Sequence, residues 1–482
     1  MYLQAFIGNG SLWRTPCKVS LSHNNDPRAG SKEILVTLSH RKSLPLRPLT
    51  AALLTASLLG AGGQALADDD PIKVGILHSL SGTMAISETV LKDTVEMLIA
   101  KQNEQGGLLG RQLEAVVVDP ASNWPLFAER ARELLAQHEV DVVFGNWTSV
   151  SRKAVLPVFE ELNGLLFYPV QYEGEESSEN VFYTGAAPNQ QAIPAVEYLI
   201  NEMGIERFAL LGTDYVYPRT TNRILEAFLK EEHGIADEDI MVNYTPFGHS
   251  DWQNIVAEVR RFGSEGKPTA VVSTINGDAN VPFYRELGNQ GVDAGDIPVI
   301  AFSVGEQELT GIDTAPLVGH LAAWNYFMSV DTDANYDFID AWIEWTGDEE
   351  AVTNDPMEAH YIGFNMWAEA VRKAGTTDPD AIKDAIIGVV VPNLSGSYAA
   401  MMPNHHITKP VLIGEVQDNG QFDIVWQTPS TVVGDAWSDF LPGSRDLMAD
   451  WQAPMRCGNF NVATGRCGGS TAAEEAEAAL AE

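Results

Sequence analysis

The sequence predicts an α/β protein with two doubly wound parallel sheets in tandem. Two observations predict it. Short apolar runs alternate with segments of helical periodicity from Ile72 onward, and the same alternation starts again after residue 189. Each helix brings the chain back to the edge of the sheet at which the previous strand began, so successive strands are parallel. Two sheets make two lobes, and ligand sites favour the space between lobes.

The first half of the chain shows the βα alternation most clearly. The helix expected after the first strand has apolar residues at helical spacing and stops at Gly106-Gly107. The expected strands are Ile72–Leu77, Leu113–Val118, Val140–Phe144, Gly164–Tyr168 and Val181–Tyr183. The expected helices are Glu88–Gln105, Phe127–Gln137 and one that starts near Lys153.

The second half repeats the alternation and then changes character. Its expected helices are Ile193–Met203, Asn222–Glu232, Trp252–Phe262 and Val281–Gly288, and its expected strands are Arg207–Leu211, Ile240–Tyr244, Ala270–Ser273 and Ile297–Ala301. A further strand at Leu321–Phe327 and helices at Tyr336–Trp345, Pro356–Ala374 and Asp380–Val389 follow. Asn419-Gly420 predicts a hairpin between Val411–Val416 and Gln421–Trp426.

Charge and the amino terminus indicate where the protein acts. The chain has 482 residues and a formal net charge of −36, which argues against nucleic acid as a partner because phosphates would be repelled. Basic residues at Arg41, Lys42 and Arg47 precede the apolar run Leu49–Leu59, and small residues follow up to Ala67. We therefore expect residues 1–67 to form a leader with a signal peptide, cleaved after Ala67. No later stretch approaches the length of a transmembrane segment.

The cysteines fit an exported protein. Cys17 lies in the expected leader, and the expected mature chain holds only Cys457 and Cys467 in a Gly-rich tail. Two such thiols in an oxidising compartment favour a disulfide between Cys457 and Cys467. Half of a metal site is the alternative, but it lacks two further ligands nearby.

Residues at the ends of the expected strands are the candidates for a ligand site, because ligands bind there in open α/β sheets. They are mostly aromatic or hydroxylic, which suits a small, flat, uncharged polar molecule. The Arg fork that a carboxylate would require is not evident at these turns. The candidates are Gly145, Asn146, Trp147, Thr148, Ser149, Tyr168, Tyr215, Tyr217, Asn276, Ser81, Ser303 and Tyr326.

Motifs of catalysis and metal binding are absent from the sequence. It has no HExxH, GxSxG or Walker pattern, so we expect no catalytic residues, no metal and no cofactor. His405-His406 could ligate a metal, but without partners at ligand spacing a surface loop is the better interpretation. Ser149 or Ser151 is expected to cap the helix after Gly145, and Ser303 to Glu306 to form a capping box. Asp119 is expected to cap a turn.

Four segments carry a resemblance to a known family. They are Thr148-Ser149 with Arg152-Lys153-Ala154-Val155, Phe167 to Gly174, Ala187-Pro188-Asn189-Gln190, and Asp214 to Arg219. With them the chain, from about Ile72 to Trp426, resembles the type I substrate-binding proteins of ABC importers, in the branched-chain amino acid-binding superfamily. Within that superfamily it is most similar to the urea and short-chain amide receptors.

The resemblance implies a fold, a ligand and a partner. It implies three crossings between lobes: residues 68–188 with about 327–391 would form lobe 1, residues 189–326 with about 392–430 lobe 2, and residues 431–482 a C-terminal extension. Ser149, Tyr168, Tyr215 and Tyr217 would contact an amide group. Val170 stands where the amide sensors tend to carry a hydroxyl, which favours urea.

We therefore expect a periplasmic urea receptor that delivers its ligand to an ABC permease at the inner membrane. The alternatives are a short-chain amide or branched-chain amino acid receptor, an amide-sensing regulator and an amidohydrolase. A single undivided body, or a gap lined with paired ionised groups where Ser149 and Tyr215 meet, would overturn the expectation of an uncharged ligand held between two lobes.

Overall fold

The structure is a computed structural model that describes residues 70–310 and 312–441, with short backbone segments at β17 (Leu447–Met448), β18 (Phe460–Asn461) and β19 (Arg466–Cys467). The expected leader and its cleavage site lie outside the described residues, and so does the expected disulfide of Cys457 with Cys467. In the part of the chain that is described, no helix has both the length and the hydropathy needed to cross a bilayer.

The first lobe is built on a five-stranded sheet whose strands are all parallel, in the order β2-β1-β3-β4-β5. The strands are β1 (Ile72–Leu77), β2 (Leu113–Val118), β3 (Val142–Gly145), β4 (Leu166–Tyr168) and β5 (Val181–Tyr183). The helices of this lobe are α1 (Ala85–Glu104), α2 (Trp124–Ala136), α3 (Ser149–Leu162), α9 (Asp333–Thr346), α10 (Asp355–Ala374) and α11 (Pro379–Ile386).

The second lobe has a seven-stranded sheet in the order β15-β14-β10-β9-β8-β6-β7. Its strands are β6 (Arg207–Thr213), β7 (Ile240–Thr245), β8 (Thr269–Thr274), β9 (Val299–Ala301), β10 (Leu321–Trp324), β14 (Leu412–Val416) and β15 (Phe422–Gln427). Its helices are α4 (Ala192–Asn201), α5 (Val216–Glu231), α6 (Gln253–Gly263), α7 (Asn280–Gln290) and α8 (Glu306–Leu309). The sheet is mixed, because the hairpin β14–β15 adds two antiparallel edge strands.

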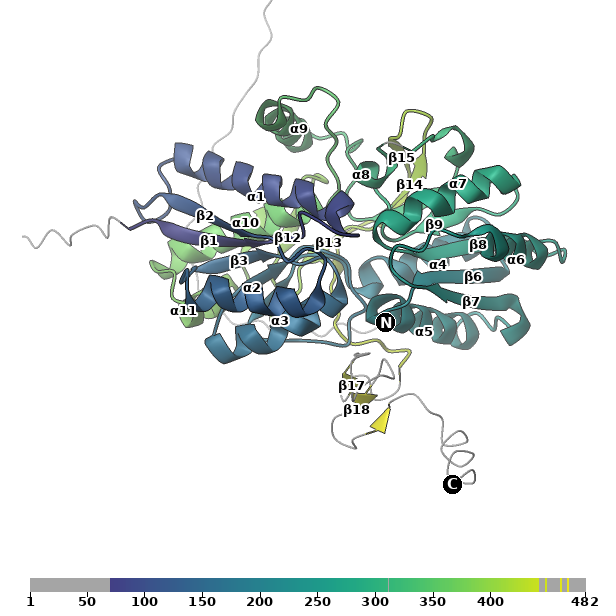
Figure 1. Ribbon diagram of the computed structural model, residues 1–482, viewed down its shortest axis with the longest axis horizontal. Helices are drawn as coiled ribbons and strands as arrows, with labels where there is room; N and C mark the ends of the chain where they lie inside the picture. The colour runs from purple at the N-terminus through teal and green to yellow at the C-terminus, as the bar shows by residue number, and fades with distance from the viewer. Residues whose placement is uncertain (1–69, 311, 442–446, 449–459, 462–465, 468–482) are drawn as a thin grey trace, which may run out of the picture. The chain divides into compact units, whose positions relative to one another are not determined.

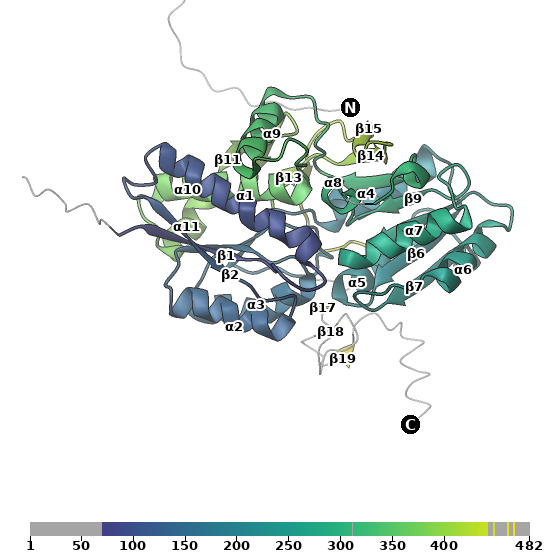
Figure 2. The ribbon, with the colours of Figure 1, turned by 45° about the horizontal axis from the view of Figure 1, so that its top comes forward.

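Each sheet is covered by helices on both faces, as the continuous apolar composition of its strands requires. In the first lobe α1, α10 and α11 pack on one face, and α2 and α3 pack on the other (Figure 2). In the second lobe α4 and α5 cover one face and α6 and α7 the other (Figure 1). The predicted α/β class with doubly wound sheets is therefore confirmed.

Three crossings connect the lobes, and they lie against one another. The first follows β5, the second follows β10, and the third lies near Lys409. The Gln190 side chain donates to the Ile407 carbonyl at 2.9 Å, and the Asn325 side chain donates to the Pro410 carbonyl at 2.6 Å. Two short strands precede the third crossing and extend the first lobe: β11 (Val390–Pro392) and β12 (Tyr398–Ala400).

The third crossing therefore comes later than the boundary near residue 392 that the resemblance implied. Val391, Ala399, Met401 and Ile407 all belong to the core of the first lobe. After them β13 (Thr408–Lys409) pairs with β16 (Val432–Val433).

His405 and His406 precede this crossing, and the prediction that they occupy a surface loop is wrong. His406 stacks on Tyr183 with ring centroids 4.6 Å apart, and its ring also bonds to the Tyr172 hydroxyl. Among the described residues no group of three His, Cys, Asp or Glu side chains could hold a metal ion.

Buried carboxyl groups surround the crossings, with Lys409 among them. Its ammonium group lies 3.6 Å from Asp355 and 3.5 Å from Glu358, and none of the three side chains is more than 1% exposed. Glu306 is also buried; one of its oxygens accepts the Met328 N–H at 2.7 Å, and the other has no hydrogen-bond partner among the described residues. Burial, with smaller contributions from the neighbouring Glu308 and Asp355, raises the pKa of Glu306 to about 8.

The raised pKa of Glu306 predicts a pH dependence of stability. The folded protein binds this proton more tightly than the unfolded chain, so the stabilisation is complete below the usual pKa of 4.5 and is lost as the pH rises toward about 8. Glu306→Gln replaces the carboxyl group with an amide, which does not titrate in this pH range. Between pH 5 and pH 8 the free energy of unfolding of the wild type should fall relative to that of the variant. We expect the difference, variant minus wild type, to rise by more than about 1.4 kcal/mol, the equivalent of a tenfold change in proton affinity.

Urea or guanidinium denaturation at a series of pH values measures this difference. Glu369→Gln, at an exposed position on α10, is the matched control and should give a difference that does not vary with pH. A Glu306→Gln difference that is equally flat would contradict the prediction.

Candidate functional site

The turn between β3 and α3 places the first candidate residues at the edge of the first lobe. Gly145 has φ +156°, and a Cβ there would lie 2.2 Å from the Leu77 carbonyl oxygen, so β3 can approach β1 this closely only with glycine. Thr148 is the N-cap of α3, and its hydroxyl accepts the Ser151 N–H at 3.2 Å. The expectation that Ser149 or Ser151 is the cap is therefore wrong, and the Ser149 hydroxyl is available for other contacts.

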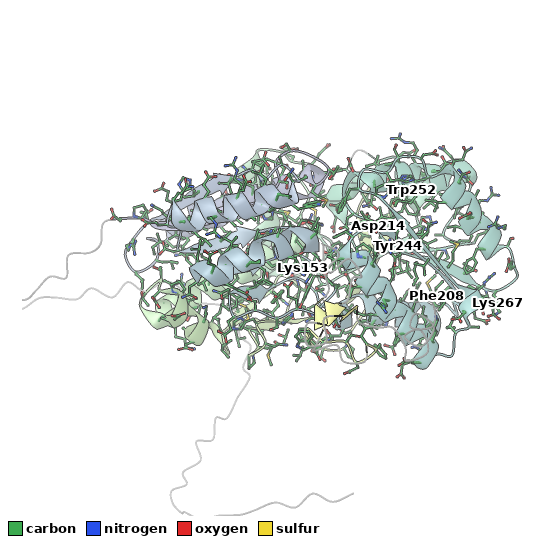
Figure 3. The ribbon with its side chains drawn as sticks, turned by 60° about the horizontal axis from the view of Figure 1, so that its bottom comes forward. Lys153, Phe208, Asp214, Tyr244, Trp252 and Lys267 are labelled. Carbon is green, nitrogen blue, oxygen red and sulfur yellow. The ribbon has the colours of Figure 1, made fainter. Side chains whose placement is uncertain are left out.

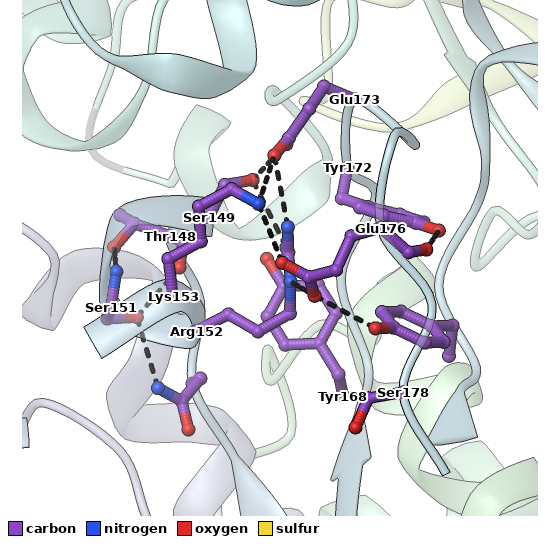
Figure 4. Close-up of polar contacts among 12 residues, drawn as sticks. Thr148, Ser149, Ser151, Arg152, Lys153, Tyr168, Tyr172, Glu173, Glu176 and Ser178 are labelled. Carbon is purple, nitrogen blue, oxygen red and sulfur yellow. Dashed lines mark hydrogen bonds and ion pairs between the residues drawn. The ribbon is translucent and has the colours of Figure 1, made fainter. Parts of the chain in front are cut away.

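Ser149 belongs to a buried network of charged groups (Figure 4). The guanidinium of Arg152 donates to Glu173 at 3.0 Å, to Glu176 at 2.7 Å and to the Ser149 hydroxyl at 3.2 Å. The Ser149 hydroxyl itself donates to Glu173. Lys153 donates to the second oxygen of Glu176 at 2.7 Å. Two cations and two carboxylates thus balance one another, and the Arg152 side chain is 0% exposed.

The charge balance shows in the acid–base properties of the network. Burial alone would raise the pKa of Glu176, but Arg152 and Lys153 overcome it and hold that pKa well below its usual value. Burial alone would lower the pKa of Arg152, yet Glu176 and Glu173 raise it well above its usual value. Both groups are therefore charged at neutral pH.

Aromatic rings enclose the guanidinium. Its central carbon lies 4.7 Å from the ring centroid of Tyr168 and 4.6 Å from that of Tyr172, within the range of cation–π attraction. The Tyr168 hydroxyl donates to the Trp147 carbonyl. Burial raises the pKa of Tyr168, so this hydroxyl stays protonated and donates.

The second lobe contributes Tyr215 and Tyr217 from the start of α5. This helix begins at Val216, six residues before the expected Asn222, because Pro218 falls in the first turn, where a missing N–H costs no helical hydrogen bond. The ring of Tyr215 lies 4.8 Å from that of Phe247. Val150 of α3 packs against the cluster that Tyr215 forms with Val216 and Tyr217, so this cluster lies against the first lobe. Burial raises the pKa of Tyr215 well above its usual value.

Direct hydrogen bonds join the two lobes around these tyrosines. The Gln171 side chain donates to the Ser303 hydroxyl at 2.7 Å, and the Trp147 indole N–H donates to the Asn276 side chain at 3.3 Å. Figure 3 shows Lys153 of the first lobe and Asp214 of the second near the boundary between the lobes. These hydrogen bonds show that the lobes are in contact here. Accordingly, Ser149, Tyr217 and Ser303 are at most 2% exposed.

Polar atoms at this boundary remain without partners. The Tyr217 hydroxyl lies near Ser303 and Gln171 but makes no well-aligned hydrogen bond, and Gln171 Oε1 has no partner among the described residues. Away from the boundary, in the turn before α3, Asn146 Oδ1 also has no partner among the described residues. Burial raises the pKa of Tyr217, so its hydroxyl is an uncharged donor. A buried donor and acceptors without partners are what a small polar ligand could satisfy.

The structure does not bring every candidate residue to this boundary. Ser81 is exposed and donates to Asp119 at 2.9 Å, and Asp119 caps the turn as predicted by accepting two backbone N–H groups. The Tyr326 hydroxyl bonds to Asn335 and Thr353, each at 2.6 Å, in the second crossing. Gly145 and Asn146 shape the turn before α3, where Asn146 adopts φ +69°.

Ser303 lies at the boundary between the lobes, and it does not cap a helix. The N-cap of α8 is Gly305, two residues later than the sequence suggested, and the Glu308 carboxylate accepts the Gly305 N–H at 3.0 Å. The expected box at Ser303 to Glu306 is therefore wrong, and Ser303 is free to accept from Gln171.

Three further residues at the boundary were missed by reasoning from sequence: Arg152, Gln171 and Glu173. The expectation of a site with little charge is therefore wrong, because the candidate hydroxyls adjoin paired ionised groups. One signal was present: Gln171 and Glu173 stand in the Phe167–Gly174 segment that carried the family resemblance. The pairing of Arg152 with Glu173, 21 residues apart, required the fold.

Comparison with known proteins agrees with this architecture. The family model described as a periplasmic binding protein domain matches residues 72–443. The chain is 23% identical over 374 residues to Leu/Ile/Val-binding protein homolog 7 of Brucella melitensis, which covers 70% of this chain and 85% of that protein. A segment of 114 residues is 31% identical to limonene hydroxylase of Geobacillus stearothermophilus, but it covers only 24% of this chain and 21% of that protein.

A solved structure shows the same fold. The solute-binding protein of an ABC transporter from Rhodopseudomonas palustris HaA2, in complex with p-hydroxybenzoic acid, superimposes with a TM-score of 0.66 at 21% identity, covering 76% of this chain and 99% of that one. The match over residues 72–443, the two-lobed fold and the candidate site at the strand ends agree. The chain therefore belongs to the family of proteins with a periplasmic binding protein domain, and it is similar to the Leu/Ile/Val-binding proteins.

Proposed function

We propose that this protein binds urea between its lobes and delivers it to an ABC permease, without chemical change to the ligand. One observation carries the proposal. The ionised groups beside the candidate site neutralise one another, while the buried Tyr217 hydroxyl and Gln171 Oε1 have no hydrogen-bond partner in the part of the chain that the structure describes. A ligand that satisfies them must be small and polar and must both donate and accept hydrogen bonds.

The charge network disfavours a carboxylate ligand. A buried carboxylate needs a cation to replace its hydration, but Arg152 already donates to Glu173 and Glu176. Glu173 would also repel an anion. One relative is named for Leu, Ile and Val, and one similar solved structure contains p-hydroxybenzoic acid. All of these ligands carry a carboxylate. Paired ionised groups beside Ser149 were expected to rule out an uncharged ligand. We keep the uncharged ligand because these groups neutralise one another, and among the described residues of the network no cation is left unbalanced.

Urea matches the groups that are left. Its carbonyl oxygen can accept from the Tyr217 hydroxyl, and its two NH₂ groups can donate to Gln171 Oε1 and to the Glu173 carboxylate. Closed lobes exclude water, which strengthens each hydrogen bond. A ceiling of about −1.5 kcal/mol per heavy atom gives urea roughly −6 kcal/mol, a dissociation constant in the tens of micromolar.

The proposal includes export to the periplasm through cleavage after Ala67. The basic residues and the apolar run before that position support it. N-terminal sequencing of the mature protein tests it. A sequence that begins before Leu49 would favour an amide-sensing regulator.

The second candidate is a receptor for branched-chain amino acids or short amides, favoured by the similarity to Leu/Ile/Val-binding protein homolog 7. Calorimetry with urea, acetamide, thiourea and leucine separates the two. We expect urea to bind and leucine to give no heat, because its carboxylate finds no free cation. Binding of leucine without binding of urea would overturn the urea proposal. An ammonia assay after incubation with urea tests for an amidohydrolase, and we expect no release.

Tyr217→Phe tests the unpartnered hydroxyl. It removes one oxygen and leaves the ring, so urea affinity should fall roughly five- to tenfold while the fold is retained. Tyr284→Phe is the control, because Tyr284 is equally buried on α7, in the second lobe. Ser149→Ala and Tyr215→Ala should also weaken binding without unfolding the chain. Unchanged affinity in all three site variants would show that the site lies elsewhere.

Arg152→Met tests the charge balance on which the proposal depends. It leaves Glu173 and Glu176 buried with only Lys153, so the free energy of unfolding should fall by about 3 to 5 kcal/mol. Arg132→Met removes the same kind of cation from an exposed pair with Glu161, where water screens the attraction, and should cost far less. Chemical denaturation measures both. Equal losses would mean that the Arg152 network contributes no more than a surface pair.

A further inference from the structure

The loop that carries Gln171, Glu173 and Glu176 adopts an unfavourable backbone conformation. Within this ligand loop, defined as residues 171–176, Gly174 has φ +70° and Glu175 has φ +59°. Glycine tolerates the left-handed region, but a glutamate there is strained and needs support from its surroundings. Because these two residues lie directly between Glu173 and Glu176, their conformation decides where both carboxylates point.

The support comes from a segment more than 250 residues away in the sequence. We define the strap as residues 432–441. Its Ala436 carbonyl accepts the Glu175 N–H at 2.5 Å, and its Ser438 N–H donates to the Glu175 carboxylate at 3.0 Å. The strap also lies so close to Gly174 that a Cβ there would be 2.7 Å from the Ala436 oxygen. Ala436 and Glu175 are each 1% exposed.

The strap is itself anchored at both ends. Near its start, Asn189 in the first crossing donates to the Val433 carbonyl at 2.7 Å and accepts the Asp435 N–H at 3.0 Å. Near its end, the ring of Phe440 packs edge-on against Phe228 of α5, with centroids 5.2 Å apart. The strap therefore connects the first crossing, the ligand loop and the helix whose other end carries Tyr217.

We propose that the strap is a positioning element, which holds the ligand loop in the left-handed conformation that places Glu173 and Gln171 at the boundary between the lobes. The consequence for ligand affinity rests on the proposed function. The sequence assigned this region only to a C-terminal extension of unknown role. In the folded chain, residues 432–441 supply two hydrogen bonds to Glu175 in the left-handed part of the loop.

Substitutions at Glu175 test the strap without touching the binding groups. Glu175→Ala removes the acceptor for the Ser438 N–H, and Glu175→Gln keeps a side-chain oxygen in its place. Glu179→Ala is the control, because Glu179 is exposed and follows the same loop. Two measurements are made on each full-length variant: urea affinity by calorimetry, and hydrogen–deuterium exchange of residues 171–176 without ligand. Thermal unfolding confirms that each variant is folded.

We expect Glu175→Ala to weaken urea binding about tenfold and to speed exchange of the ligand loop at least tenfold. Glu175→Gln should restore affinity to within about threefold of the wild type, and Glu179→Ala should match the wild type. Unchanged exchange in Glu175→Ala would overturn the proposal, and so would faster exchange with unchanged affinity.

If the wild type does not bind urea, the proposed function fails. The strap is then judged by exchange and by the affinity of whichever ligand in the calorimetry panel does bind. If none binds, the exchange rates alone decide: faster exchange in Glu175→Ala and recovery in Glu175→Gln support the strap.

Discussion

The burial of Arg152 between two carboxylates is the interaction on which the first lobe's side of the site depends. A guanidinium without solvent is tolerated only where carboxylates and aromatic faces replace its hydration. Here Glu173 and Glu176 supply the charge, and Tyr168 and Tyr172 supply the faces. Because the carboxylates come from the loop after β4 and the guanidinium from α3, the ion pairs join the ends of two neighbouring strands.

The same network decides what kind of group is left over for a ligand. Charges that are balanced within the protein cannot bind a charged ligand without losing their partners. The remaining polar atoms at the boundary, such as the Tyr217 hydroxyl and Gln171 Oε1, are uncharged. A second buried set of charges, Lys409 with Asp355 and Glu358, lies at the crossings.

Much of the fold could be predicted from local sequence patterns. Strands such as Ile72–Leu77 and Leu113–Val118 have the predicted bounds, because a buried parallel strand is a continuous apolar run with polar ends. The Asn419-Gly420 hairpin was also predicted correctly, since its turn depends on two adjacent residues. Helix starts were predicted less well. Thr148 rather than Ser149 caps α3. Several neighbouring residues there carry hydroxyl groups, and a sequence pattern cannot tell which of them is the cap.

The sequence by itself determined the two-lobed α/β architecture and most of the residues at the strand ends, because periodicity and turn chemistry are local properties. Only the tertiary structure decided which of those residues meet. It brought Tyr217 to Gln171 and Ser303, and it kept Ser81 and Tyr326 away from them. Ion pairs and crossings join segments far apart in the chain, so their partners follow from how the sheets pack, which no local pattern contains.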